Sequence, residues 1–254
     1  MASIISSFNE AFSDDFAWLK LIVYAIPSFY LVTLTNHGDI SPYVFGVAIF
    51  CSFLELGLLT DGIHNVRMSK SNVLTLNPLK WIWAGILALI VLIPNVLIFG
   101  GIAFGIIMFL TKLIYQPVAL IIVSIVVYAI FYSIVATSYL SFAKHLNLIQ
   151  AFRYIVVLKS SADILVGLFF MVIQMAILNV IFIAPGYYVA FLLKIPYTHS
   201  ALMFYCCVVS VLNISILANY LSQLASEQIE ESNETYDENM NMSDVIADIS
   251  ERMS

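Results

Sequence analysis

Charge is scarce in this sequence. Only 10% of the 254 residues are Asp, Glu, Lys or Arg, whereas about a quarter of a typical soluble domain is charged. Hydrophobic residues make up 62% of the chain, and the mean hydropathy is +0.99. A soluble protein of this size could not shield so much apolar surface from water, so the composition favours a protein that lies in a lipid bilayer.

Catalytic and ligand-binding motifs are absent as well. The sequence contains no GxSxG, HExxH, Walker or GxGxxG motif, and its four histidines fall in predicted loops without acids at ligand spacing. The three cysteines, Cys51, Cys206 and Cys207, lie in hydrophobic segments without metal-ligand spacing and are typical of apolar packing thiols. We therefore predict no enzyme activity, no cofactor, no metal and no nucleic-acid partner.

Long hydrophobic runs dominate what is present. Strands of a membrane barrel alternate apolar and polar residues, and these runs do not alternate. The sequence thus predicts an all-α, polytopic membrane helical bundle. The six predicted transmembrane helices cover residues 17–35, 42–60, 81–110, 117–140, 163–185 and 199–222. Residues 1–15 contain no Lys or Arg, so the first run is predicted to be a retained span and not a cleaved signal.

Two spans leave alternatives open. The run over 81–110 is longer than the ~20 residues that a bilayer needs. It either tilts, kinks, or divides near Pro94 and Gly100, and division would give seven spans. The fifth span could continue past Pro185 as far as Leu193.

The distribution of Lys and Arg predicts the orientation. With six spans, eight basic residues share the side of both termini, and two, Lys112 and Lys194, lie on the other side. The positive-inside rule then places both termini in the cytoplasm, and we expect a location in the cell membrane.

Two short segments have one hydrophobic face. Residues 145–159 and 4–12 carry apolar side chains at helical spacing, which predicts amphipathic helices at the membrane surface. The alternative is that each is an ordinary connecting helix packed on protein.

Spans three to six resemble a repeated pair of helical hairpins. Phe109–Lys112 and Tyr139–Ser141 recur in similar form 82 and 81 positions later, respectively. Spans one, three and five each contain a proline, Pro27, Pro94 and Pro185. Each proline deprives a carbonyl four residues earlier of its helical partner. Those carbonyls belong to Val23, Ile90 and Ile181.

Few polar residues fall inside the spans. Glu55 is the notable one, because a carboxylate in lipid normally forms an ion pair or faces an aqueous cavity. We expect an ion pair with Lys20, His64 or Lys144, and the alternative is a proton or solute site. The neutral residues Asn95, Gln174, Asn179, Asn213 and Asn219 are typical of interhelical hydrogen bonds, although the first four with Glu55 make up a candidate intramembrane polar site.

The C-terminal residues differ sharply from the rest. We divide the chain into a membrane domain, residues 1–222, and an acidic tail, residues 223–254. The tail contains nine acids and one Arg. Its composition predicts disorder over 226–242, and residues 243–253 could form a short helix that docks on a cytoplasmic or membrane protein partner.

The arrangement resembles the prokaryotic membrane protein family known as domain of unknown function 4013. The resemblance rests on the acidic-aromatic entry Phe12–Lys20, on Gly62–Val66 after the second span, on Asn77-Pro78 before Trp81, and on Ala151-Phe152 followed by Asp163. It covers about residues 8–222. The family has no assigned activity, so the resemblance implies topology and not function.

Two functions remain from the sequence. The preferred hypothesis is a non-enzymatic accessory, scaffold or membrane-organising component. It rests on the lack of catalytic motifs and on the predicted surface helices and acidic tail. The alternative is a small-solute transporter or permease subunit that uses Glu55.

Overall fold

The computed structural model describes residues 3–13, 16–36, 41–68, 77–193 and 198–230. These residues form eight α-helices and one π-helical turn, and they form no strand. In chain order the elements are α1 (Ile4–Ser13), α2 (Ala17–Asn36), α3 (Pro42–Arg67), α4 (Pro78–Leu110), α5 (Pro117–His145), α6 (Leu148–Ala151), α7 (Tyr154–Leu193), α8 (Thr198–Ala225) and η1 (Ser226–Glu230).

Six of the helices are long and apolar enough to cross a membrane, namely α2, α3, α4, α5, α7 and α8. The predicted all-α polytopic bundle is confirmed, and the chain is a multi-pass membrane protein. The third span is one continuous helix of 33 residues, so it is not divided in two. The fifth is part of a 40-residue helix that does reach Leu193.

Local sequence explains where several helices begin. Ser41 caps α3 by accepting a hydrogen bond from the Val44 N–H, and Asn77 caps α4 by accepting one from the Lys80 N–H. A proline follows each cap, at the first helical position, where its missing N–H costs no hydrogen bond. At the end of α5, Leu146 adopts a left-handed conformation (φ 53°) that stops the helix.

The three predicted proline positions lie inside helices. Pro27 is in α2, Pro94 in α4 and Pro185 in α7. Each of these is the first helix of a hairpin, formed by α2–α3, α4–α5 and α7–α8 in turn. Neighbouring helices and side chains make such interruptions tolerable in a membrane.

The amphipathic helix predicted over 145–159 is not a separate helix. The chain leaves α5 at His145, makes the single turn of α6, and enters α7 at Tyr154. The cause is the left-handed Leu146 followed by Asn147, whose side chain accepts a hydrogen bond from the Ile149 N–H and starts a new turn. Ser138 of α5 then donates to the Ala151 carbonyl at 2.7 Å and holds α6 against α5.

The helix predicted over 4–12 is present as α1. Phe8 and Phe12 on its apolar face pack against the hydrophobic core, while Ile5 is exposed. Phe8 also stacks on Phe182 of α7, with ring centroids 5.8 Å apart. Glu10 accepts a hydrogen bond from Asn219 of α8. This helix therefore packs on protein along one face, as the alternative for this segment proposed.

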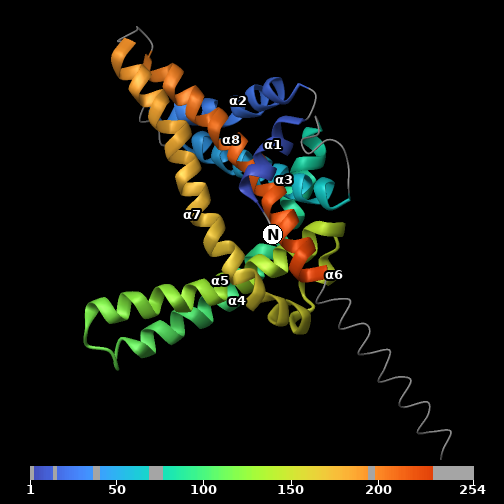
Figure 1. Ribbon diagram of the computed structural model, residues 1–254, viewed down its shortest axis with the longest axis vertical. Coiled ribbons are helices and arrows are strands. Elements are labelled where there is room, and N and C mark those ends of the chain that lie inside the picture. The colour runs from blue at the N-terminus through green and yellow to red at the C-terminus, as the bar shows by residue number, and fades with distance from the viewer. Residues whose placement is uncertain (1–2, 14–15, 37–40, 69–76, 194–197, 231–254) are drawn as a thin grey trace, which may run out of the picture.

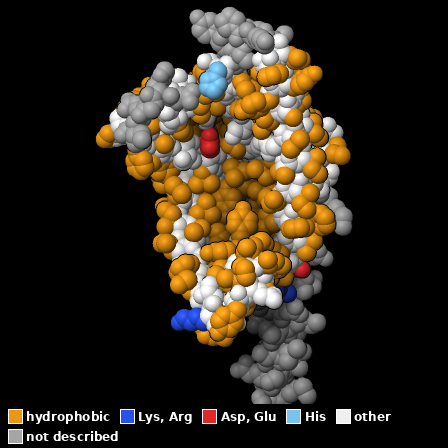
Figure 2. All heavy atoms as spheres, turned by 90° about the vertical axis from the view of Figure 1, so that its left-hand side faces the viewer, with side chains coloured by type: hydrophobic (Ala, Val, Ile, Leu, Met, Phe, Trp, Pro, Cys, Tyr) orange, Lys and Arg blue, Asp and Glu red, His pale blue; other side chains and the backbone are white. Residues whose placement is uncertain are grey.

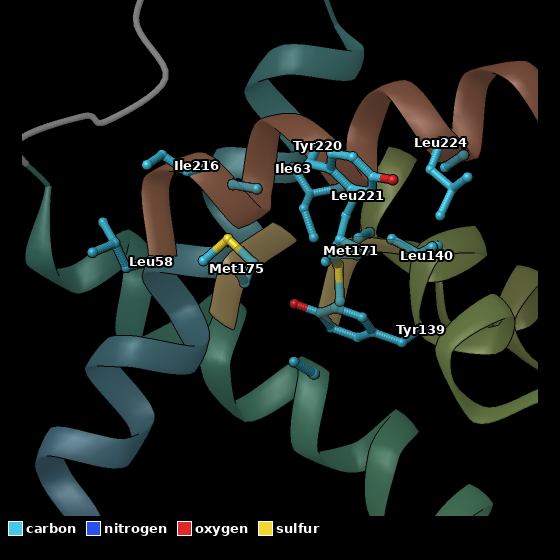
Figure 3. Close-up of a cluster of buried hydrophobic side chains, with 14 of the residues drawn as sticks. Leu58, Ile63, Tyr139, Leu140, Met171, Met175, Ile216, Tyr220, Leu221 and Leu224 are labelled. Carbon is cyan, nitrogen blue, oxygen red and sulfur yellow. The ribbon is translucent and has the colours of Figure 1, made fainter. Parts of the chain in front are cut away.

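Two long hairpins diverge from a common base. In Figure 1 the outer parts of α4 and α5 project away from α7 and α8, whereas the four helices approach one another near the beginning of α7. The core cluster in Figure 3 lies at this junction, with Leu58 and Ile63 of α3, Tyr139 and Leu140 of α5, Met171 and Met175 of α7, and four labelled residues of α8.

Polar side chains are buried in the same base. Asp61 of α3 forms an ion pair with Lys80 of α4, and Asn65 contributes its amide to Asp61 and its carbonyl oxygen to Lys80, at 3.2 and 3.5 Å. Thr60 and Tyr139 share a hydrogen bond of 2.8 Å. We call these five residues, together with Ser222, which donates to the Ile63 carbonyl, the polar base.

Helices α3 and α4 approach closely at two glycines. A Cβ atom at Gly57 would overlap the carbonyl oxygen of Trp81, and one at Gly85 would overlap that of Phe53. Small residues at such positions let backbones pack tightly in membranes.

The outer part of the second hairpin is packed differently. We call residues 96–132, from the end of α4 through the connection to the start of α5, the outer arm. Ala103 is its only buried residue. Between the two helices lies a cleft of about 1000 Å³, lined by apolar side chains such as Val96 and Ile121.

Candidate functional site

Glu55 lies on a cavity inside the membrane-spanning part of the protein. The cavity measures about 390 Å³ and is formed by α2, α3, the start of α4 and one residue of α8. Most of the lining is apolar or aromatic. The lining residues are Val23, Tyr24, Pro27, Ser28, Phe50, Cys51, Leu54, Glu55, Leu58, Pro78, Trp81 and Val211.

The carboxylate of Glu55 is held by a hydroxyl group. Ser28 of α2 donates to Glu55 Oε1 at 2.6 Å, and both side chains are half-buried. Among the described residues, Glu55 forms no ion pair with Lys20, His64 or Lys144. The predicted ion pair for this residue is therefore wrong for all three named cations. The partner of Glu55 at this contact is thus a neutral hydroxyl group and not a cation.

Pro27 shapes the wall next to Glu55. Because proline has no N–H, the Val23 carbonyl one turn earlier lacks its helical hydrogen bond. Both Val23 and Pro27 line the cavity. The proline position of α2 therefore lies on the same cavity as the carboxylate of Glu55.

Two aromatic residues also line the cavity. Tyr24 and Trp81 meet edge to face, with centroids 4.6 Å apart. Trp81 Nε1 is buried and has no hydrogen-bond partner among the described residues. The faces of Trp and Tyr attract cations, and an N–H without a partner can donate to a polar group of a ligand.

A hydrophobic surface surrounds these spans. Figure 2 shows one side of the molecule as a mainly hydrophobic surface with a hollow, and an acidic side chain is visible toward its upper end. The Lys and Arg side chains visible in that view lie toward the lower end. This separation is what lipid on one face requires.

The other four predicted site residues do not join Glu55. Asn95 of α4 is fully buried and donates to the Val91 carbonyl of its own helix at 2.8 Å. Gln174 of α7 is half-buried. None of these four residues lines the Glu55 cavity. The candidate polar site is therefore not a single site.

Two of the five residues do meet each other. Asn213 of α8 donates to Asn179 Oδ1 of α7 at 2.6 Å, and Asn179 donates to the Met175 carbonyl at 2.9 Å. This is the interhelical hydrogen bond that the sequence predicted for neutral polar residues in spans. Asn219, predicted in the same group, binds Glu10 of α1.

Sequence reasoning missed the most buried charge. Asp61 is 1% exposed and pairs with Lys80, yet the predicted second span ended at residue 60. The available signal was the spacing of Asp61 and Asn65, which places both on one face of a helix that continues past that point.

No metal-binding cluster of three or more His, Cys, Asp or Glu side chains occurs among the described residues. Cys51, Cys206 and Cys207 are free thiols, and Cys51 lines the Glu55 cavity.

No family model matches the chain, and no significant match exists among curated proteins or solved structures. The resemblance to domain of unknown function 4013 stays a prediction.

Proposed function

We propose that this multi-pass membrane protein binds a small, hydrophobic organic cation at Glu55 and acts as a small-solute transporter or permease subunit. The observation that carries the proposal is the carboxylate of Glu55 on the wall of a 390 Å³ cavity whose other described lining residues are mainly apolar. Ligand sites commonly combine an apolar lining with a few oriented polar groups.

The cavity lining favours a cation over an anion. Glu55 supplies negative charge, Val23 supplies a carbonyl without its helical partner, and Tyr24 and Trp81 supply aromatic rings. Among the described residues of the lining there is no Lys or Arg. A hydrophobic cation would place its charge near Glu55 and its apolar groups against Phe50, Leu54 and Leu58.

A direct binding measurement tests this proposal. Full-length protein in mild detergent is titrated with radiolabelled tetraphenylphosphonium. We expect saturable binding that Glu55→Gln weakens by at least tenfold, because the amide keeps the shape and removes the charge. Glu55→Asp should retain part of the affinity. Asp163→Asn, which neutralises an exposed acid of α7 away from the cavity, is the matched control.

Two results would reject the site. One is the lack of saturable binding to the unmodified protein. The other is an affinity of Glu55→Gln equal to that of the control. Transport itself is then measured as uptake of the same probe into proteoliposomes, where Glu55→Gln is expected to remove the protein-dependent component.

The second candidate function is the accessory or scaffold component. The outer arm favours it, because its two helices pack on each other and leave large side chains such as Leu97 and Tyr115 exposed at 70% and 92%. Mild-detergent purification with mass spectrometry tests it: a stoichiometric membrane protein partner supports a scaffold, and purification without any partner counts against one.

Location and orientation are part of the proposal. We place the protein in the cell membrane with both termini in the cytoplasm, on the strength of the Lys and Arg distribution. The acidic tail would then be available to a cytoplasmic partner, although residues 231–254 lie outside the described part of the chain.

A further inference from the structure

A second cavity, with the opposite charge, lies where α3 and α5 end and α7 begins. It measures about 90 Å³ and is lined by Arg67, Lys144, His145 and Arg153, with Ser141, Gln150, Val156 and Ile229 completing the wall. A single ordered water needs roughly 10–15 Å³. The cavity therefore has room for a group with several polar atoms.

The basic side chains converge from different parts of the chain. Arg67 comes from the last turn of α3, Lys144 and His145 from the last turn of α5, and Arg153 from the residue before α7. The lining residues that the structure describes include no Asp or Glu. Basic side chains from three elements therefore concentrate positive charge at one place. Basic residues spread along a single helix would not do so.

The cavity is held in shape by hydrogen bonds. Arg67 Nη1 donates to the Leu140 carbonyl at 2.8 Å, which fixes the end of α3 on α5. His64 Nδ1 bonds the Lys144 carbonyl at 2.8 Å and joins the same two helices one turn away. The Arg153 carbonyl in turn accepts from the N–H groups of Val156 and Val157 and anchors the start of α7.

Exposed hydrophobic side chains occur one position away from residues of the cavity wall. Ile149 and Ile155 are 74% and 73% exposed, and Phe152 is also exposed. Each is adjacent to a residue of the cavity wall. A basic pocket at the ends of membrane-spanning helices, with exposed apolar side chains one position along the chain from its wall, suits a lipid, whose phosphate and acyl chains need these two environments near each other.

We propose that this cavity binds the phosphate group of an anionic phospholipid. The guanidinium groups of Arg67 and Arg153 suit phosphate oxygens, Lys144 adds a point charge, and Ser141 and Gln150 offer neutral hydrogen bonds. The lipid would join the ends of α3, α5 and α7. This site is separate from the Glu55 cavity, with which it shares no residue.

Binding of short-chain lipids tests the proposal. Full-length protein in detergent is titrated with dioctanoyl phosphatidylglycerol and, in parallel, with dioctanoyl phosphatidylcholine. We expect phosphatidylglycerol to bind at least tenfold more tightly. The variant Lys144→Gln/Arg153→Gln should lose at least tenfold in affinity for phosphatidylglycerol, and Arg153→Lys should lose much less because it keeps the charge.

A matched control separates the cavity from general surface charge. Lys159→Gln removes one positive charge from α7, six residues after Arg153, outside the cavity wall. Its affinity for phosphatidylglycerol should stay within twofold of the unmodified protein. The thermal midpoint and the monodispersity of every variant without added lipid confirm that the fold is retained.

Four outcomes would overturn the proposal. Equal affinity for the two lipids would remove the charge preference, and an equal loss in Lys159→Gln would make the effect non-specific. Binding of inorganic phosphate without binding of phosphatidylglycerol would assign the pocket to a free anion. The acidic tail is tested with a full-length variant in which Glu231, Glu234, Asp237 and Glu238 are made neutral. If phosphatidylglycerol binds only to that variant, the tail and not a lipid occupies the cavity.

Discussion

The polar base and the outer arm share α4 and α5 but are held together in different ways. At the base, the Asp61–Lys80 pair joins α3 and α4, and the same two helices also approach closely at Gly57 and Gly85. In the outer arm, α4 and α5 border an apolar cleft of about 1000 Å³. There Phe99 and Phe131 meet at a centroid distance of 6.4 Å.

The difference shows what holds helices together in lipid. Apolar side chains gain little free energy by moving from lipid to another apolar surface. Close backbone approach and interhelical hydrogen bonds must therefore stabilise the association of the helices. The base contains both, and the outer arm has a single buried residue, Ala103. The fold should therefore be most sensitive to change in the base.

The largest effect is expected for Lys80→Met. This change removes the Lys80 ammonium group from the carboxylate of Asp61, which is only 1% exposed. Removing one partner of a buried pair costs roughly 3–5 kcal/mol, and we expect the low end, about 3 kcal/mol, because the Lys80 side chain is itself 34% exposed. The free energy of unfolding in a dodecyl sulfate titration measures the effect.

Two further variants make this test specific. Lys159→Met removes an exposed cation of α7 and should change stability by less than about 0.5 kcal/mol. Asp61→Leu/Lys80→Met removes both charges and should recover much of the loss, because the cost comes mainly from the unpaired carboxylate. A loss below 1 kcal/mol in Lys80→Met would mean that the pair does not stabilise the base.

The sequence predicted the base less well than the spans. Length and hydropathy were enough to predict all six spans, because a helix that crosses a bilayer must be long and apolar whatever it contacts. Asp61, however, follows directly after the predicted end of the second span, and Lys80 was considered only for orientation. Their pairing depends on how α3 and α4 pack, which hydropathy does not report.

The candidate site was predicted in part. A carboxylate in an apolar run is unusual enough to single out Glu55 from the sequence. Its partner, Ser28, lies 27 residues away on α2, and a serine in a span has no comparable signal. The Asn179–Asn213 bond likewise required knowledge of which faces of α7 and α8 meet.

A medium effect is expected for Gly57→Ala. The added methyl group would overlap the Trp81 carbonyl oxygen, a backbone atom that cannot rotate away. Forcing α3 and α4 apart should cost about 1–3 kcal/mol, more than the gain in helix propensity of roughly 0.5–1 kcal/mol. The same unfolding titration measures this, and unchanged stability would show that the two helices are not in close contact.

The smallest effect is expected for Gly101→Ala, the same substitution in the outer arm. A Cβ atom at Gly101 meets nothing within 4 Å, so the helix-propensity gain is unopposed and stability should rise by about 0–1 kcal/mol. Paired with Gly57→Ala, this variant compares one chemical change in the two regions. A fall of more than 1 kcal/mol in the free energy of unfolding would contradict the open space beside Gly101 in the outer arm. The methyl group would then have to displace something packed against Gly101. The effect should in that case depend on protein concentration if a second copy covers the arm, and size-exclusion chromatography of both glycine variants over a range of concentrations would detect it.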